Sequence, residues 1–298
     1  MNKLPLEKRV QILSMLCEGS SMRSVSRVCD VSINTVTKLL VDTGRACATF
    51  HDQKVRGLTA QRIQVDEIWS FVGVKEANLF SAKTVREDSG DVWTWTAIDA
   101  DTKLIATFLV GDRDYQSGRT FMADLKSRLA NRVQLTSDGH KTYFYAVQQT
   151  FGDDVDYAQL HKIYGKDKDA KNERRYSPPV CLGVETKKIT GNPDEKHIST
   201  SFVERQNLTM RMHMRRFTRL TNGFSKKFEN HVWMVALYTV WYNFVKQHKT
   251  LKGLTPAMAA GISDTFWSMT ELAEMVDASL PAPGKRGPYK KQQVIPAT

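Results

Sequence analysis

The feature that most constrains the fold is a run of three β-prone segments in the first half of the chain. These segments are rich in Val, Ile, Thr, Trp and Phe, and they span Arg62 to Lys75, Val92 to Ala100 and Lys103 to Gly111. Such residues favour extended backbone that packs in a sheet. The Asp- and Thr-containing residues 99–102 supply a turn between the second and third segments. We therefore predict three consecutive antiparallel strands.

Helical and extended patterns alternate after the third predicted strand. Helical patterns mark Ser117 to Ala130 and Thr142 to Phe151, and strand patterns mark Val133 to Thr136 and Val155 to Ile163. Three strands followed by helix, strand, helix and strand is the order of an RNase H-like core, in which helical crossovers add parallel strands to an antiparallel trio. The predicted fold class is therefore α/β, an RNase H-like mixed sheet flanked by helices.

Residues 1–50 are predicted to form three short helices, as an N-terminal helix-turn-helix domain does. Ser32 can cap the third helix, in which Ile33 and Val36 are expected to face inward. The N-terminal residues of such a recognition helix contact base edges in the major groove of DNA. The candidate DNA-binding residues at this position are Asn34, Thr35, Thr37 and Lys38. The alternative is a three-helix cap that contacts only protein.

The remaining divisions follow from composition and periodicity. The segment 164–198 has no clear periodicity and is rich in Lys, Arg, Asp, Gly and Pro, so we predict an insertion there. Helices are predicted to resume at Ser199 to Phe217 and at Ser225 to Gln247. The predicted divisions are a linker at 51–61, a catalytic domain at 62–262, a C-terminal helix at 263–280 and a disordered basic tail at 281–298.

The charge balance favours a polyanionic partner. The chain has 43 Lys and Arg residues against 32 Asp and Glu residues, a net charge of +11, and such an excess attracts polyanions. Four scattered cysteines without a CxxC pair indicate a reducing compartment rather than a zinc ribbon or a disulfide framework. The most apolar run, Val232 to Val245, is shorter than the roughly 20 residues that a bilayer requires. We therefore expect no membrane partner.

Three acidic residues stand where a metal site can form. Asp66 interrupts an apolar predicted strand, and by alternation it faces the side of the sheet opposite to Glu67, so only one of the two can join a given site. Asp138 follows the fourth predicted strand, and Glu204 lies one turn into a later helix. Each acid alone has an ordinary explanation as a solvated strand residue, a turn residue or a helix-dipole partner. Their combined placement predicts a shared site.

The segment that carries Glu204 is unusually basic. Between Ser199 and Val232, seven basic residues accompany two acidic ones. Arg211 stands two helical turns beyond Glu204 on the same face, and Arg215 is expected to extend that stripe by one more turn. The candidate DNA-binding residues of this segment are Arg205, Arg211, Arg215, Lys226 and Lys227. An exposed basic helix face is the alternative explanation, above all for Arg216 and Arg219.

Three motifs together resemble the insertion-sequence-one family of bacterial DDE transposases, within the retroviral integrase superfamily. The motifs are Val65-Asp66-Glu67-Ile68-Trp69-Ser70-Phe71-Val72-Gly73, Thr136-Ser137-Asp138-Gly139, and Val203-Glu204-Arg205-Gln206-Asn207-Leu208 followed by Arg211 and Phe224-Ser225-Lys226-Lys227. The resemblance implies that Asp66, Asp138 and Glu204 are the catalytic and metal-binding triad, and that Arg211 contacts DNA. It makes His231 a candidate accessory residue, although a lone helical histidine is more often structural.

The resemblance further implies a DNA transposase that hydrolyses a phosphodiester bond and then joins the exposed 3′-hydroxyl to target DNA. The expected cofactor is a pair of Mg²⁺ ions, for which Mn²⁺ can substitute, since carboxylates hold such ions for in-line phosphoryl displacement. The expected partners are double-stranded DNA and further copies of the chain in a synaptic complex, in the bacterial cytoplasm at the nucleoid. The alternatives are a catalytically inactive helix-turn-helix regulator and a structure-selective nuclease of the same fold.

Overall fold

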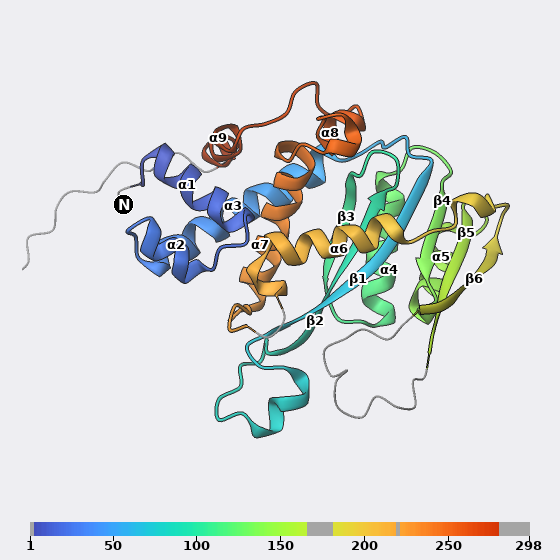
Figure 1. The fold of residues 1–298 in the computed structure, drawn as a ribbon, viewed down its shortest axis with the longest axis horizontal. Helices are drawn as coiled ribbons and strands as arrows, with labels where there is room; N and C mark the ends of the chain where they lie inside the picture. The colour runs from blue at the N-terminus through green and yellow to red at the C-terminus, as the bar shows by residue number, and fades with distance from the viewer. Residues whose placement is uncertain (1–2, 166–180, 219–220, 280–298) are drawn as a thin grey trace, which may run out of the picture.

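Six strands form one mixed sheet in the order β3-β2-β1-β4-β5-β6 in the computed structural model, which describes residues 3–165, 181–218 and 221–279 (Figure 1). The strands are β1 (Arg62–Val72), β2 (Gly90–Asp99), β3 (Ile105–Gly111), β4 (Gln134–Asp138), β5 (Asp156–Tyr164) and β6 (Cys181–Thr190). The first three pair antiparallel, β4 and β5 add to β1 in parallel, and β6 closes the edge antiparallel to β5. The predicted mixed sheet is confirmed.

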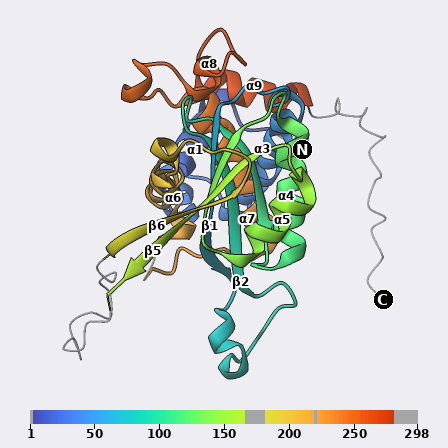
Figure 2. The same ribbon diagram turned by 90° about the vertical axis from the view of Figure 1, so that its right-hand side faces the viewer.

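Helices cover both faces of the sheet. The crossover helices α4 (Tyr115–Arg128) and α5 (Lys141–Phe151) lie on one face, and α6 (Ser201–His213) lies on the other (Figure 2). The later helices are α7 (Phe228–Val240), the π-helical turn η4 (Trp241–Val245), α8 (Pro256–Ala259) and α9 (Met269–Ser279). Single 3₁₀ turns are η1 (Glu76–Ser81), η2 (Glu195–His197), η3 (Arg215–Phe217) and η5 (Lys249–Leu251). No helix among the described residues is both long enough and apolar enough to cross a bilayer.

The N-terminal helices are α1 (Leu6–Cys17), α2 (Met22–Val28) and α3 (Ile33–Lys54), so helices stand where the sequence predicts them. The predicted linker at 51–61 is wrong in its first part, because α3 continues to Lys54. The long C-terminal part of α3 packs against α7. Gly44 of α3 is so close to Trp233 of α7 that an added Cβ would lie 2.4 Å from that side chain. Ile33 is also not inward-facing, since it is 41% exposed.

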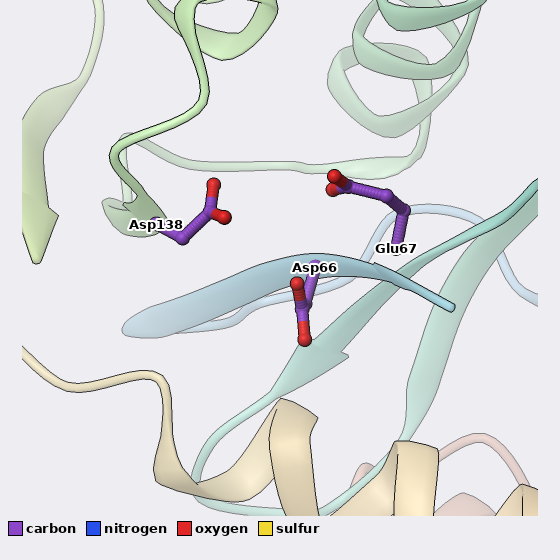
Figure 3. A group of neighbouring side chains, drawn as sticks. All are labelled: Asp66, Glu67 and Asp138. Atoms are coloured by element: carbon purple, nitrogen blue, oxygen red, sulfur yellow. The ribbon is translucent and has the colours of Figure 1, made fainter. Parts of the chain in front are cut away.

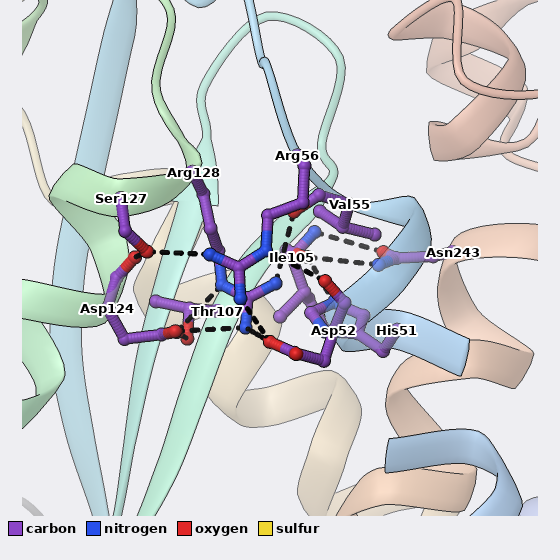
Figure 4. Close-up of polar contacts among 10 residues, drawn as sticks. All are labelled: His51, Asp52, Val55, Arg56, Ile105, Thr107, Asp124, Ser127, Arg128 and Asn243. Carbon is purple, nitrogen blue, oxygen red and sulfur yellow. Dashed lines mark hydrogen bonds and ion pairs between the residues drawn. The ribbon is translucent and has the colours of Figure 1, made fainter. Parts of the chain in front are cut away.

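Contacts of Arg128 hold the end of α3, which extends into the first part of the predicted linker (Figure 4). This buried side chain, at the end of α4, donates from Nη1 to the carbonyl oxygen of Val55 at 3.0 Å and from Nη2 to Asp52 Oδ1 at 2.8 Å. Its Nε also donates to Asp124 Oδ2 at 2.7 Å. The C-terminal end of α3 is thereby bonded directly to α4, an interaction between distant segments that no local polar composition reveals.

The predicted insertion at 164–198 contains a strand that the sequence analysis missed. Residues 181–190 form β6, an edge strand that pairs with β5 from Tyr157 to Tyr164. Most of β6 is exposed on both faces and contains Lys and Glu, as edge strands that avoid aggregation do. Because neither face is buried, β6 lacks the alternation by which strands are recognised. Residues 166–180 lie outside the described part of the chain.

The C-terminal helix is shorter than predicted. Residues 263–268 are not helical, and α9 begins at Met269. Asp277 of α9 accepts hydrogen bonds from the buried Arg9 of α1, from Nη1 at 2.5 Å and from Nη2 at 2.9 Å. The last described helix therefore packs beside the first. The predicted basic tail at 281–298 lies outside the described residues.

Asn243 completes the hydrogen bonding of the sheet edge at β3 and is the basis of a stability prediction. Its fully buried amide accepts from Ile105 N at 3.0 Å and donates to Ile105 O at 2.9 Å. Replacement by alanine leaves both backbone groups without this partner. Because Ile105 O keeps His51 Nε2 at 3.2 Å, the lost partner matters most for Ile105 N. We expect Asn243→Ala to lower the free energy of unfolding by about 1–3 kcal/mol, measured by denaturant titration. The exposed Asn78→Ala is the control, and equal losses in both variants would contradict the assignment.

Candidate active site

Three carboxylates meet where β1 and β4 lie side by side. The parallel register pairs Gln64 with Thr136, and two residues further along each strand stand Asp66 and Asp138. Carboxylate oxygens of Asp66, Glu67 and Asp138 all lie within 4.8 Å of one another. Figure 3 shows Asp66 and Glu67 leaving β1 on opposite sides, with Asp138 beside them at the end of β4. The two aspartates that the sequence singles out are therefore brought together.

Glu204 reaches the same cavity because α6 is fixed to β1 at two points. The buried Gln64 side chain accepts through Oε1 from the backbone N–H groups of Phe202 and Val203, at 2.8 and 3.2 Å. One turn further on, Asn207 Nδ2 donates to Asp66 Oδ2 at 2.8 Å. Gln64 thus caps the first turn of α6, whose N–H groups have no partner within the helix.

A cavity of about 520 Å³ is lined by Asp66, Asp138 and Glu204, so the structure brings the three predicted acids around one space. Glu204 stands apart from the closest group of carboxylates. Its Oε1 accepts from Lys162 Nζ at 2.5 Å and from Thr200 Oγ1 at 2.6 Å. Lys162, on β5, therefore forms an ion pair with Glu204.

The ionised form of Asp66 is electrostatically unfavourable in this cluster. Burial, and then the neighbouring charges of Glu67 and Asp138, raise the pKa of Asp66 to about 8. Like charges packed out of water disfavour ionisation unless a cation offsets them. The donor set fits such a cation, because Mg²⁺ and Mn²⁺ take carboxylate and amide oxygens. Asn207 adds a buried amide oxygen for which the described residues offer no hydrogen-bond partner. This cluster could bind a divalent metal.

Glu67 has a different set of partners from the aspartates. Its Oε2 accepts from Tyr143 Oη at 2.6 Å, and its Oε1 accepts from Arg113 Nη2 at 2.6 Å. The sequence analysis excluded Glu67 from the site of Asp66 because their side chains alternate, whereas the oxygens lie close enough to share an ion. Alternation separates side chains across a strand, but a glutamate is long enough to return to the strand edge. The bonds to Tyr143 and Arg113 favour an anchoring role.

Several residues of the cavity are not among those predicted from the sequence. Arg113, His140, His161 and Lys162 all line it. His140 follows Asp138 closely enough for its backbone N–H to donate to Asp138 Oδ1 at 3.0 Å. Its pKa is lowered by burial and by the nearby charge of Arg113. The sequence offered one signal for these residues. Lys162 is a basic residue near the end of β5, a strand parallel to β4, and it could have been assigned to the same edge of the sheet as Asp138.

The predicted DNA-binding residues of α3 stand at its exposed start. Asn34 is exposed, and Thr35 caps the helix together with Ser32, whose Oγ accepts from Thr35 N at 3.1 Å. Thr37 Oγ1 donates to the Ile33 carbonyl oxygen at 2.8 Å, and Lys38 pairs with Asp42 at 2.6 Å. These contacts are local to the helix, so the outer surface of its first turns remains accessible.

The basic stripe predicted along α6 is shorter than expected. α6 ends at His213, and Met214 adopts an extended conformation, so Arg215 begins η3 and does not continue the helical face of Arg211. Arg205 is exposed and Arg211 is partly buried. Lys226 and Lys227 are exposed just before α7. Arg219 lies outside the described residues.

His231 is buried away from the acidic cavity. Its Nδ1 lies 3.0 Å from Ser225 Oγ and its Nε2 lies 3.2 Å from Ser70 Oγ. Burial, with a smaller contribution from Arg216, lowers its pKa to about 3, which keeps the ring neutral. Both ring nitrogens are engaged in bridging β1 to the segment before α7, as a structural histidine would be.

Comparison with known proteins gives structural neighbours of low identity. No protein-family model and no curated protein matches the chain. The piggyBac transposase synaptic complex with hairpin DNA, solved by cryo-EM, is similar at 11% identity and a TM-score of 0.37, over 93% of this chain and 73% of that one. The Mos1 paired-end complex with left transposon end (12%) and the Mos1 strand transfer complex (13%) have TM-scores of 0.22 and align over 51% of this chain and 58% and 57% of theirs. We therefore base the functional assignment on the residues of the cavity.

Divalent metal should stabilise the folded protein through the aspartate pair. A ligand that binds only the folded state at about 100 times its Kd adds about 2.7 kcal/mol, which for a chain of this size raises Tm by several degrees. We expect Mg²⁺ or Mn²⁺ to raise the Tm of the wild type and to have little effect on Asp138→Asn. The exposed Asp264→Asn should respond as the wild type does. An undiminished shift in Asp138→Asn would remove Asp138 from the metal site.

Gln64 should act on the metal site through the position of α6. Gln64→Leu removes the acceptor for two N–H groups of α6 and frees the helix end that carries Glu204. We expect about 10-fold weaker Mn²⁺ binding, as for other residues that orient metal ligands, measured by isothermal titration calorimetry. The exposed Gln61→Leu is the matched control. Unchanged Mn²⁺ affinity in a folded Gln64→Leu protein would show that the helix position does not matter for the metal.

Proposed function

We propose that the chain is a DDE-type DNA transposase with an RNase H-like catalytic core, of the insertion-sequence-one-like kind. The observation that carries the proposal is the convergence of Asp66, Asp138 and Glu204 on one cavity. These residues come from two neighbouring parallel strands and a helix far along the sequence. Their types and order agree with the motifs on which the family resemblance rests.

The cavity suits chemistry on a phosphodiester. Asp66 and Asp138, with Glu204, would hold two Mg²⁺ ions, which supply activation of the attacking oxygen and stabilisation of the leaving oxygen. The chain itself offers two cations to a phosphate at this place, because Arg113 and Lys162 line the same cavity. A guanidinium can bind two phosphate oxygens side by side, whereas an ammonium acts as a point charge. Both side chains could orient the scissile phosphate while the carboxylates hold the metal ions.

Two reactions would use this one site. Water attacks the phosphorus at the element end, the bond to the 3′-oxygen breaks, and a 3′-hydroxyl is released. That hydroxyl then attacks a target phosphodiester in the same way, so the new bond replaces the old one without an external energy source. Holding two element ends at once calls for a dimer or larger assembly on double-stranded DNA, in the bacterial cytoplasm at the nucleoid.

A plasmid assay tests the proposal directly. The purified protein is incubated with Mg²⁺ and a plasmid carrying the candidate element ends, and products are resolved on a gel. We expect joined products from the wild type, and a loss of at least about 1000-fold for Asp138→Asn, which corresponds to about 4 kcal/mol of lost transition-state stabilisation. End binding by Asp138→Asn should persist in a gel shift. Asp264→Asn serves as the charge-matched control.

The same assay separates the alternatives. Nicked plasmid without joined products would indicate a structure-selective nuclease and overturn strand transfer. A gel shift without any cutting would indicate a DNA-binding regulator. Full activity of Asp138→Asn would remove the triad assignment.

A further inference from the structure

A second recess of about 600 Å³ lies between the N-terminal helices and the segment that follows α6. Its walls come from α2, from the start of α3, and from residues 215–216, 222–226, 230 and 234. The basic residues that line it are Arg23, Arg27, Arg215, Arg216 and Lys226, and no acidic residue lines it. Its charge is therefore opposite to that of the acidic cavity.

The described residues do not neutralise the cations of this recess. Within residues 3–165, 181–218 and 221–279, Arg23, Arg27 and Arg215 form no ion pair, and all three are exposed. Lys226 is exposed beside the ring of Phe224, with Nζ 4.0 Å from the ring centroid. Like charges gathered around a recess repel one another, and an anion between them relieves the repulsion.

Arg216 has a separate role as the support of one wall. Its guanidinium is desolvated enough to lower its pKa to about 10, and Nη1 donates to Ser225 Oγ at 3.0 Å and to the carbonyl oxygen of Asn230. These bonds hold the segment before α7 in place, with Lys226 next to the bonded serine. Because Arg216 is bonded to this wall, it supports the recess, and the other four basic residues of the lining, Arg23, Arg27, Arg215 and Lys226, are left to bind an anion.

Helix α6, which carries Glu204 of the acidic cavity, runs toward the N-terminal helices, and residues of these helices line the recess (Figure 1). The C-terminal end of α6 contacts the α1–α2 connection, where His213 Nδ1 lies 3.0 Å from the Cys17 carbonyl oxygen. An added Cβ on Gly19 would lie 2.6 Å from the Met212 carbonyl oxygen, so this approach is close. From Glu204 to His213 the helix spans about 14 Å at 1.5 Å per residue. About two and a half turns of α6 thus separate Glu204, which lines the cavity, from His213, which contacts the end of α1.

The recess also adjoins the exposed start of α3. Ile33 and Thr37, on the first two turns of that helix, belong to its lining. The hydroxyl-bearing Ser20 lines the recess together with the arginines, and arginine with hydroxyl donors is the usual set for the phosphates of nucleic acid. The position beside a helix start and the excess of arginine favour a nucleic-acid backbone over an acidic protein segment.

We propose that this recess binds the sugar–phosphate backbone of double-stranded DNA, through Arg23, Arg27, Arg215 and Lys226. The choice of DNA as the anion rests on the proposed function. Neutralising phosphates releases counterions, so binding that uses these residues weakens as salt increases, with a slope of about 0.9 per phosphate contact. Arg23 and Arg27 belong to α2, so this helix becomes a backbone-contacting element beside α3.

The test measures binding without metal, so that no cleavage is involved. A fluorescent duplex of arbitrary sequence is titrated with the full chain by fluorescence anisotropy, at several salt concentrations. We expect the Arg23→Ala/Arg27→Ala double variant to bind at least about 10-fold more weakly and its salt slope to fall by about 1.8. Arg215→Ala should weaken binding in the same direction, and Arg215→Lys should restore most of it, since the charge remains.

The control is Lys249→Ala/Lys252→Ala, which removes two positive charges outside the recess. It should leave affinity and slope near the wild-type values, and circular dichroism should confirm that all variants fold. If the control variant loses as much duplex affinity as the recess variant, net charge alone explains the loss and the proposal is overturned. A recess variant that binds polyglutamate more weakly and the duplex normally would overturn it as well.

The outcome is distinguishable from that of the proposed function. If the recess variants lose duplex binding while the wild type leaves the plasmid uncut, the recess assignment stands and the transposase assignment fails. If the plasmid yields joined products while the recess variants bind the duplex as the wild type does, the recess assignment fails alone.

Discussion

Repulsion among carboxylates at the junction of β1 and β4 is the constraint on which the rest of the site depends. Burial beside Glu67 and Asp138 raises the pKa of Asp66 to about 8, so the fully ionised cluster is unfavourable on its own. The chain relieves part of this repulsion with Arg113 on Glu67 and with Lys162 on Glu204. The aspartate pair receives neutral donors instead, the amide of Asn207 on Asp66 and the backbone N–H of His140 on Asp138, and it is there that a cation has most to offset.

The strand pattern made the core of the fold predictable. Strands β1 to β3 are dense in β-branched and aromatic residues, and helical spacing marks α4 and α5 clearly, so their order defines the sheet before any contact is known. The same logic placed Asp66 and Asp138 together, because parallel strands that start in register bring equivalent positions side by side. What the sequence predicted well is therefore what local pattern and strand pairing determine.

Contacts between distant segments account for the errors. Arg128 keeps α3 helical beyond its predicted end by bonding to Val55, and β6 is a strand because β5 offers it an edge. Gln64, which sets the position of α6, looks like an ordinary polar residue in an apolar strand. Each of these depends on a partner at least 17 residues away, and periodicity along the chain contains no information about such a partner. The prediction that Arg215 extends the basic face of α6 is wrong for the opposite reason, because the helix ends locally at His213.

The opposite charges at the two ends of α6 determine how a polyanion can approach. Charges further apart than the Debye length, about 10 Å at 0.1 M salt, are largely screened, and about 14 Å of helix separates Glu204 from His213. DNA contacting the arginines near the end of α6 would therefore experience little repulsion from the acids. A phosphate that enters the acidic cavity meets those carboxylates at short range, with only Arg113 and Lys162 to offset them. Under the proposed function, holding DNA and admitting its reactive phosphate would thus be electrostatically separate steps, and only the second would require that the charge of the aspartate pair be neutralised first.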